Sequence, residues 1–265
     1  MLSFMTTLAS RTITALRSEH DTLSGTAAAL SPAQLTGTSG ASEWTVAQVL
    51  SHLGSGAEIS LASFRASVGE AAPPGPDFNQ GVWDRWNAMS PADQAAGSLA
   101  INGELVETLE ALPADQHDAI KVKLGFLPEP VTLTAYAGMR LNEVANHGWD
   151  VRVAVDPSAT IDDDAAQLLA EHFAGGLSFL LGFIGKPATA EPAVIAIGET
   201  PFAIVLDGGT RLSSEPLDTT ATFTGPIESA VRLISGRLTP PFTPAGVTVT
   251  GNISLDDLRR AFPGY

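Results

Sequence analysis

The chain has 265 residues, of which 44% are hydrophobic and 16% charged, a composition typical of a well-packed globular protein and not of a disordered one. Its net charge of −15 leaves no basic surplus with which to bind a nucleic acid or an anionic membrane surface. It contains no cysteine, which excludes disulfides and thiolate ligands; any metal site must use His, Asp, Glu or water, and any thiol chemistry must take its thiol from outside.

Two apolar segments bear on the location of the protein. The N-terminus lacks the basic residues that precede the apolar part of a signal peptide, so residues 5–30, with their helical spacing of apolar positions, predict a helix instead. Residues 173–185 (FAGGLSFLLGFIG) are the most apolar run, but this run is shorter than a bilayer span and indicates a buried helix. We therefore expect a cytoplasmic protein that does not bind membranes.

The first two-thirds of the chain is predicted to be helical. Ser31 followed by proline marks a helix start, and a long helix begins after Thr45. Residues 69–81 are the clearest loop because they contain three prolines. Helices restart at Ser90, run over about residues 132–155, and begin again in the acidic segment that follows, where acids favour a helix start. Long helices joined by loops predict an antiparallel four-helix bundle.

The pattern changes near residue 187, where short β-branched runs bounded by glycine or proline replace the helical spacing. These predicted strands are 193–198, 202–209, 220–225 and 246–251, with helical segments at 226–238 and 254–262. Strands mixed with helices indicate an α+β domain. We predict a helical bundle over residues 1–187 and a small α+β domain over residues 188–265.

Three side chains form a candidate metal site. Glu143 and His147 are four residues apart on a predicted helix, so both project from one face and can reach the same ion. That spacing is common by chance, and an ordinary acid and histidine on a helix face is the alternative. His52, on the other well-marked helix, is the candidate third ligand, and two histidines with one carboxylate are the ligand set of a catalytic zinc site with an open position. A core-edge histidine bonded to a carbonyl or to water is the alternative for His52. The other histidines, at 20, 117 and 172, are predicted to be surface or packing residues.

The two segments that carry these side chains resemble a known family. SEWTVAQVLSHL, around His52, and NEVANHGWDVRVAV, around His147, are similar to two motifs of the mycothiol-dependent maleylpyruvate isomerases. That family belongs to the DinB-like metal-binding four-helix bundles. The resemblance covers nearly the whole chain and implies a C-terminal α+β domain like that of sterol carrier proteins. It also implies that His52, Glu143 and His147 are the metal ligands.

Other residues gain candidate roles from the resemblance. Asp150 is placed to orient an imidazole, and Trp149 to line a cofactor pocket. A surface or helix-terminal acid is the alternative for Asp150, and a core aromatic is the alternative for Trp149. Trp44 is predicted to anchor the helix start. Arg232 and Arg237 lie in a segment that resembles the one supplying a substrate-binding arginine, and a solvated helix arginine is the alternative for each.

The resemblance implies a metal-dependent enzyme that uses mycothiol as cosubstrate. A coordinated thiol loses its proton and becomes the nucleophile, which then adds to a small electrophile. An S-transferase is favoured over a dedicated maleylpyruvate isomerase, because nothing in the sequence specifies an aromatic-acid pathway. Zinc is the expected metal, although nickel, cobalt or iron(II) accept the same ligands.

The alternatives to an enzyme are a non-catalytic metal-binding protein and an apolar-ligand carrier that acts through the C-terminal domain. The oligomeric state stays open.

Overall fold

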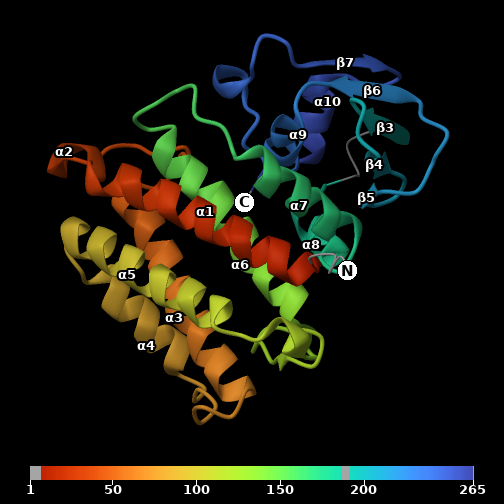
Figure 1. Cartoon of the computed structure of the whole chain (residues 1–265). Helices are drawn as coiled ribbons and strands as arrows, with labels where there is room; N and C mark the ends of the chain where they lie inside the picture. Colours follow the sequence, from red (N-terminus) through yellow and green to blue (C-terminus); the bar gives the residue numbers. More distant parts are fainter. Residues whose placement is uncertain (1–6, 187–190, 265) are drawn as a thin grey trace, which may run out of the picture. The chain divides into compact units, whose positions relative to one another are not determined.

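A computed structural model describes residues 7–186 and 191–264 of the chain, which divides into two compact units, Met1–Ala159 and Thr160–Tyr265 (Figure 1). The first unit is mostly helical, and the second combines helices with a five-stranded sheet, so the predicted fold class is confirmed. The compact units divide before the predicted boundary at residue 187. The segment between the two positions forms α7 (Asp163–Ala174) and α8 (Ser178–Ile184), which pack against the sheet unit. The domain boundary itself stays a prediction.

Four long helices build the first unit. They are α1 (Leu8–Ala28), α3 (Val46–Ser67), α5 (Pro91–Glu110) and α6 (Leu133–Arg152), with the shorter α2 (Pro32–Leu35) and α4 (Phe78–Asn87) beside them. Helix α1 packs against α5 and α6, and α3 packs against the same two helices, which is the arrangement of a four-helix bundle. A two-stranded ribbon of β1 (Lys121–Val122) and β2 (Val131–Thr132) follows a 3₁₀ turn at Ala114–Gln116.

Side-chain caps fix the starts of the two helices that carry the candidate ligands. Thr45 caps α3 through a capping box with Gln48, whose side chain accepts from the Thr45 backbone N–H. The Thr132 hydroxyl accepts from the backbone N–H of Ala135 at the start of α6. Each cap satisfies a backbone N–H that has no partner inside the helix. The predicted starts of both helices are therefore confirmed.

The predicted loop at residues 69–81 is too long at its C-terminal end. Helix α4 begins at Phe78, two residues after Pro76, which is the last proline of the segment. Gly81 lowers the helix propensity of this stretch, yet the helix forms because Trp86 packs into the bundle, where it is 3% exposed. Tertiary packing therefore decided an element that local sequence signals did not predict.

Helix α6 is buried on almost every side. Its position between α1 and α3 places polar side chains in the interior, where each needs a hydrogen-bond partner or a bound ligand. The buried polar side chains of this helix are Arg140, Asn142, Asn146, His147, Asp150 and Arg152. Such a concentration of buried polarity along one central helix indicates a functional site.

The second unit is built on one sheet in the order β5–β4–β3–β6–β7. The strands are β3 (Ala193–Ile197), β4 (Ala203–Leu206), β5 (Thr210–Ser213), β6 (Ala221–Thr224) and β7 (Thr248–Gly251), with helices α9 (Ile227–Ile234) and α10 (Leu255–Ala261) and a 3₁₀ turn at Pro240–Phe242. Strands β3 and β6 pair in parallel, and the other neighbours pair antiparallel. Four strands and both helices were predicted, whereas β5 was not.

The apolar run at residues 173–185 is not one buried helix, as the sequence predicted. It breaks at Gly175–Leu177, and Phe183 of α8 is 78% exposed. Within the described residues no single helix is long and apolar enough to cross a membrane. Only α7 and α8 taken together have the necessary length and apolar composition, and they are bent by 92° relative to each other.

Candidate metal centre

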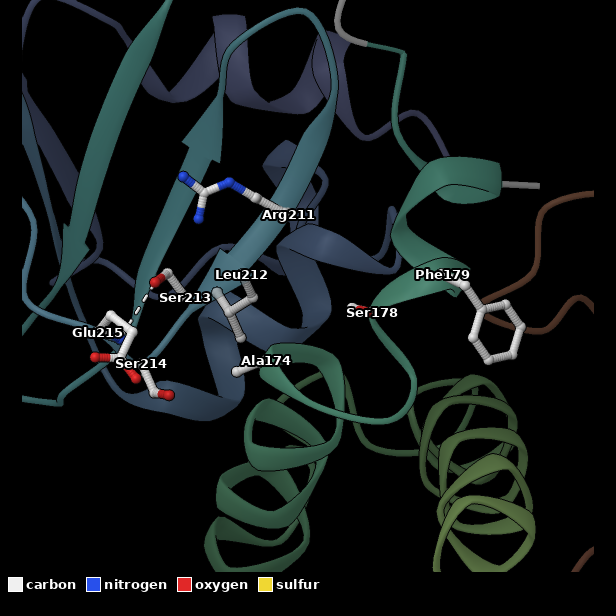
Figure 2. Close-up of a pocket in the computed structure, with 8 residues that line it drawn as sticks. All are labelled: Ala174, Ser178, Phe179, Arg211, Leu212, Ser213, Ser214 and Glu215. Carbon is white, nitrogen blue, oxygen red and sulfur yellow. Dashed lines mark hydrogen bonds between the residues drawn. The ribbon is translucent and has the colours of Figure 1, made fainter. Parts of the chain in front are cut away.

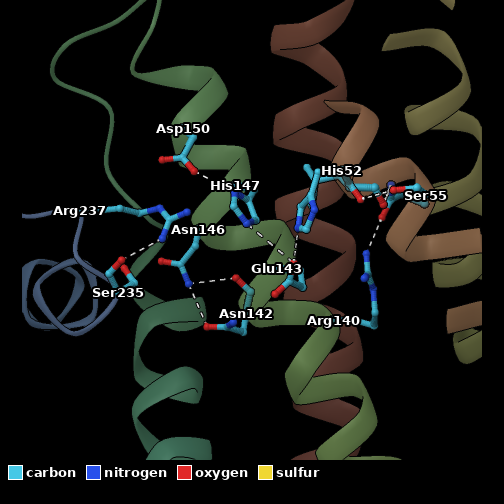
Figure 3. Close-up of polar contacts among 12 residues, drawn as sticks. His52, Ser55, Arg140, Asn142, Glu143, Asn146, His147, Asp150, Ser235 and Arg237 are labelled. Atoms are coloured by element: carbon cyan, nitrogen blue, oxygen red, sulfur yellow. Dashed lines mark hydrogen bonds and ion pairs between the residues drawn. The ribbon is translucent and has the colours of Figure 1, made fainter. Parts of the chain in front are cut away.

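His52, Glu143 and His147 meet in the first unit, as the sequence predicted (Figure 3). His52 lies on α3, and the other two lie one turn apart on α6. Their ligand atoms all lie within 4.8 Å of one another. Among the described residues, this is the one group of three or more potential His, Asp or Glu ligands.

The separations within this group suit one small cation. His52 Nε2 donates to Glu143 Oε2 at 3.0 Å, and His147 Nε2 lies 3.8 Å from the same oxygen. Ligand atoms roughly 2.0–2.1 Å from a tetrahedral zinc are about 3.3 Å apart, between the two observed values. The residues present therefore fit a divalent metal ion.

One side of the group remains open. The side chains of His52 and Glu143 are 39% and 32% exposed, whereas that of His147 is 10% exposed. Three protein ligands with access from solvent are the arrangement of a catalytic metal site, in which a further position is left for water or substrate.

Asp150 fixes the orientation of His147. The imidazole Nδ1–H donates to Asp150 Oδ2 at 2.9 Å, and the aspartate side chain is fully buried. Because Nδ1 carries the proton, Nε2 presents its lone pair toward Glu143, which is the tautomer that a metal needs. The burial of Asp150 and its partner contradict the alternative of a surface acid, although Asp150 does lie in the last turn of α6.

The loop before α3 closes over Asp150. Gly40 donates its backbone N–H to the Asp150 backbone oxygen at 2.8 Å. A Cβ atom on Gly40 would lie 2.9 Å from Asp150 Oδ1, closer than real side chains approach. Glycine at this position therefore lets the loop lie directly on the residue that orients His147.

Glu143 supplies the negative charge of the group. Burial raises the pKa of its carboxyl, but the hydrogen bond from His52 and the electrostatic attraction of His147, His52 and Arg140 outweigh that effect and hold the pKa at about 2. The carboxyl is therefore ionised at any pH near neutrality and can bind a cation without first losing a proton.

Trp44 lies against both imidazoles, a role that the sequence did not predict. Its ring centroid is 5.1 Å from that of His52 and 6.1 Å from that of His147, and the side chain is 39% exposed. The two imidazoles meet edge to face at 4.7 Å. Trp44 therefore forms an aromatic wall of the site, in addition to standing just before the cap of α3.

The structure places Trp149 in the core of the first unit. It is 1% exposed, and its indole Nε1 donates to the backbone oxygen of Ala159 at 2.8 Å. This environment matches the core-packing alternative for Trp149. Its cofactor-binding role stays a prediction.

Arg232 and Arg237 belong to the second unit. Arg232 is 2% exposed on α9, where it pairs with Glu228 at 2.7 Å and donates to the Phe242 backbone oxygen at 2.8 Å. Arg237 is 8% exposed and donates to the Ser235 backbone oxygen at 3.0 Å. Neither is a solvated helix arginine, and their role in substrate binding stays a prediction.

The three remaining histidines are packing residues. His20, His117 and His172 are all less than 9% exposed, so of the two roles predicted for them, packing is the one observed. Burial lowers the pKa of His20, which keeps that imidazole neutral near pH 7.

The second unit has a separate hollow of about 470 Å³ between α7, α8 and β5 (Figure 2). Arg211 and Phe179, which line it, point to opposite sides, and a hydrogen bond joins Glu215 N–H to Ser213 Oγ at 3.2 Å. Polar groups do not converge there as they do around His147, so the hollow is not a candidate for the chemistry.

Comparison with known proteins identifies the bundle. Residues 16–152 match the family described as the mycothiol maleylpyruvate isomerase N-terminal domain. The matched region covers just over half of the chain and contains His52, Glu143 and His147. The chain belongs to this family.

Two solved structures share the fold over their whole length. One is a crystal structure of the mycothiol-dependent maleylpyruvate isomerase, with 17% sequence identity, a TM-score of 0.66 and full coverage of both chains. The other is a histidine-to-alanine mutant of that isomerase, with 18% identity, a TM-score of 0.65 and the same coverage. No curated protein sequence matches the chain significantly. Because the identities are low, these two structures show the fold alone. That fold spans both compact units of the chain.

Proposed function

We propose that this member of the mycothiol maleylpyruvate isomerase N-terminal domain family is a divalent-metal-dependent enzyme that uses a low-molecular-weight thiol, mycothiol, against a small electrophile. One observation carries the proposal: three ligand atoms from His52, Glu143 and His147 lie within 4.8 Å of one another, with a buried carboxylate orienting one of the imidazoles. Family membership supports the choice of thiol.

The side chains divide the work of binding. His52 and His147 supply neutral nitrogen ligands, Glu143 supplies a negative oxygen, and Asp150 holds the His147 tautomer. A metal ion in this position lowers the pKa of a thiol that reaches it, so that the thiol reacts as thiolate. Trp44 bounds the space beside the two imidazoles and restricts how a thiol or substrate approaches.

We propose zinc as the metal. Two imidazoles and one carboxylate with an open position are the ligand set of catalytic zinc sites, and zinc does not itself undergo redox chemistry during thiol transfer. Nickel, cobalt and iron(II) accept the same ligands, so metal analysis of the purified protein decides between them.

Two reactions fit a thiolate held at this site. In an S-transferase reaction, the thiolate sulfur forms a bond to an electrophilic carbon, and the leaving group departs with the electron pair of the bond that breaks. In an isomerase reaction, the thiolate adds to a cis double bond, rotation follows about the resulting single bond, and elimination releases the trans product and the same thiolate. We favour the transferase reaction, because nothing in the sequence specifies an aromatic-acid pathway.

We also propose Arg237 as the residue that holds a substrate carboxylate. The buried ion pair of Arg232 with Glu228 favours a structural role for Arg232, the other candidate.

The cytoplasm is the proposed location, since a small thiol is kept reduced there.

Replacement of His52 tests the proposal. The wild-type chain is expected to bind about one divalent ion and to conjugate mycothiol to a model electrophile. His52→Ala is expected to weaken metal binding by more than about 100-fold, the upper end of what loss of an outer hydrogen-bond partner costs, and to abolish conjugation. Metal content by atomic emission and a conjugation assay measure both effects.

A matched variant, His117→Ala, removes a buried histidine of the same unit that is not part of the ligand group and is expected to keep both properties. Unchanged conjugation by His52→Ala would contradict the catalytic proposal. A wild-type chain that binds metal but conjugates no thiol would be a non-catalytic metal-binding protein. Tight lipid binding without metal would instead make it an apolar-ligand carrier.

A further inference from the structure

A buried amide on a helix that carries no metal ligand joins the two helices that do. Asn102 lies on α5 and is 3% exposed. Its Nδ2 donates to the Leu53 backbone oxygen of α3 at 3.3 Å, and its Oδ1 accepts from Arg140 Nη2 of α6 at 3.1 Å. A second donation, to Ser98 O at 2.9 Å, fixes the amide on its own helix.

Both contacts fall next to metal ligands. Leu53 directly follows His52, and Arg140 precedes Glu143 by three residues, which is about one helical turn. The path Leu53–Asn102–Arg140 therefore connects the α3 backbone at one ligand to the α6 turn that leads to the other. His52 and Glu143 are 91 positions apart in the chain, so their separation depends on contacts between the two helices and not on the spacing of residues along one of them.

The buried charge of Arg140 makes loss of its hydrogen bond to Asn102 costly. Its guanidinium is 6% exposed and is the positive charge closest in sequence to Glu143 on α6. Within the described part of the chain its Nε has no hydrogen-bond partner, so the bond to Asn102 is an important anchor for the group. Removing one partner of a buried charged hydrogen bond is costly, because the other keeps its charge in a medium of low polarity.

We propose that Asn102 and Arg140 are positioning residues that hold His52 and Glu143 at the separation a metal ion requires. Metal sites need their ligands placed within about 0.5 Å of the binding geometry, and the observed 3.0 Å between His52 Nε2 and Glu143 Oε2 meets that need before any ion binds. This inference rests on the proposed metal site, and it assigns to the interior of the bundle a role that ordinary core packing does not have.

The test compares two buried amides of α5. Asn102→Leu keeps the approximate volume and removes both cross-helix bonds. Gln94→Met is the matched control, because Gln94 is 7% exposed on the same helix and donates to Trp86 O at 3.0 Å, away from α6. Both variants are expected to lose stability. Only Asn102→Leu is expected to bind zinc about 10- to 100-fold more weakly, as outer partners of metal ligands do when changed, and to alter the absorption spectrum of bound cobalt(II).

Zinc affinity is measured by competition with a chromogenic chelator, on samples whose folding has been checked by circular dichroism. If Asn102→Leu does not fold, Asn102→Asp serves instead. It keeps the acceptor for Arg140, loses the donation to Leu53, and is expected to show a smaller loss of affinity with a shifted cobalt spectrum.

The outcomes separate this inference from the proposed function. Wild-type zinc affinity and an unchanged cobalt spectrum in a folded Asn102 variant would overturn the positioning role and leave the enzyme proposal standing. A wild-type chain that binds metal but conjugates no thiol would overturn the enzyme proposal and leave the positioning role standing. Absence of metal binding in the wild-type chain would overturn both.

Discussion

Asp150 decides which nitrogen of His147 faces the metal position. Its fully buried carboxylate accepts a hydrogen bond from Nδ1–H at 2.9 Å, so that Nε2 is left as the coordinating atom. The ring of Trp44 lies beside both imidazoles. A buried acid thus orients His147, and an exposed aromatic ring packs against both histidines.

Trp44 is expected to report metal binding by its fluorescence. An ion bound to His52 and His147 changes the charge within about 6 Å of the indole, since the centroid of the Trp44 ring lies 5.1 Å from that of His52 and 6.1 Å from that of His147. In Trp44→Phe the metal-dependent emission change should disappear. Metal affinity should fall by no more than about tenfold, because an aromatic pair contributes about 0.5–1.5 kcal/mol. Fluorescence titration with zinc measures both.

Trp83→Phe is the control, because Trp83 is 45% exposed on α4 and has no ring contact with the ligands among the described pairs. It should retain the full emission change. A full response in Trp44→Phe would contradict the placement of Trp44 at the site.

Part of the site could be predicted from residues and part could not. Glu143 and His147 share a helix face, and that spacing is visible in the sequence. His52 joins them only through the packing of α3 against α6. The sequence offered it as a third ligand on a second helix, and the resemblance to a family strengthened that choice. Asn102 carries no local signal at all, since its role depends on which backbone oxygen and which arginine lie beside it.

At the scale of elements, α3 and α4 are joined through a glycine. Gly54 of α3 faces Trp86 of α4, and an added Cβ would lie 2.2 Å from the indole ring. The indole cannot move freely, because its Nε1 donates to Glu58 Oε2 at 2.8 Å and it is 3% exposed. This close approach explains how α4 docks on the bundle in spite of its weak sequence signals.

Gly54→Ala is therefore expected to destabilise the protein, against the usual gain from replacing a helical glycine. Displacing a buried ring in a packed core costs about 1–3 kcal/mol, which lowers the urea midpoint of unfolding. Gly81→Ala, on α4 with nothing within 4 Å of the added Cβ, should instead gain about 0.5–1 kcal/mol. A Gly54→Ala protein as stable as the wild type would contradict the docking account.

The missed strand β5 shows what a closer use of turn signals adds. Asp207, Gly208 and Gly209 separate it from β4, and Gly208 has a φ of +66° that favours glycine. Asp–Gly and Gly–Gly pairs between apolar runs indicate a tight hairpin, so β5 could have been predicted from the sequence. Helix α4 was not, because its stability comes from the contact between Trp86 and Gly54.

At the scale of the whole molecule, the ligand group lies in one compact unit. His52, Glu143 and His147 all fall within Met1–Ala159 and within the matched family region. The bundle therefore supplies every proposed metal ligand. The segment 160–186 packs with the sheet unit, whereas its helical periodicity suggested the bundle; periodicity identifies a helix but not its packing partner.

The central claim is that the metal bound by His52, Glu143 and His147 deprotonates a thiol. Isothermal titration of mycothiol into the zinc-loaded protein at pH 7, repeated in buffers of different ionisation enthalpy, tests it directly by counting the protons released. Glu143, whose pKa is about 2, is already ionised and releases none. The account predicts saturable binding with about one proton released per thiol, and neither in His52→Ala. Binding without proton release, or equal binding by the His52→Ala protein, would contradict it.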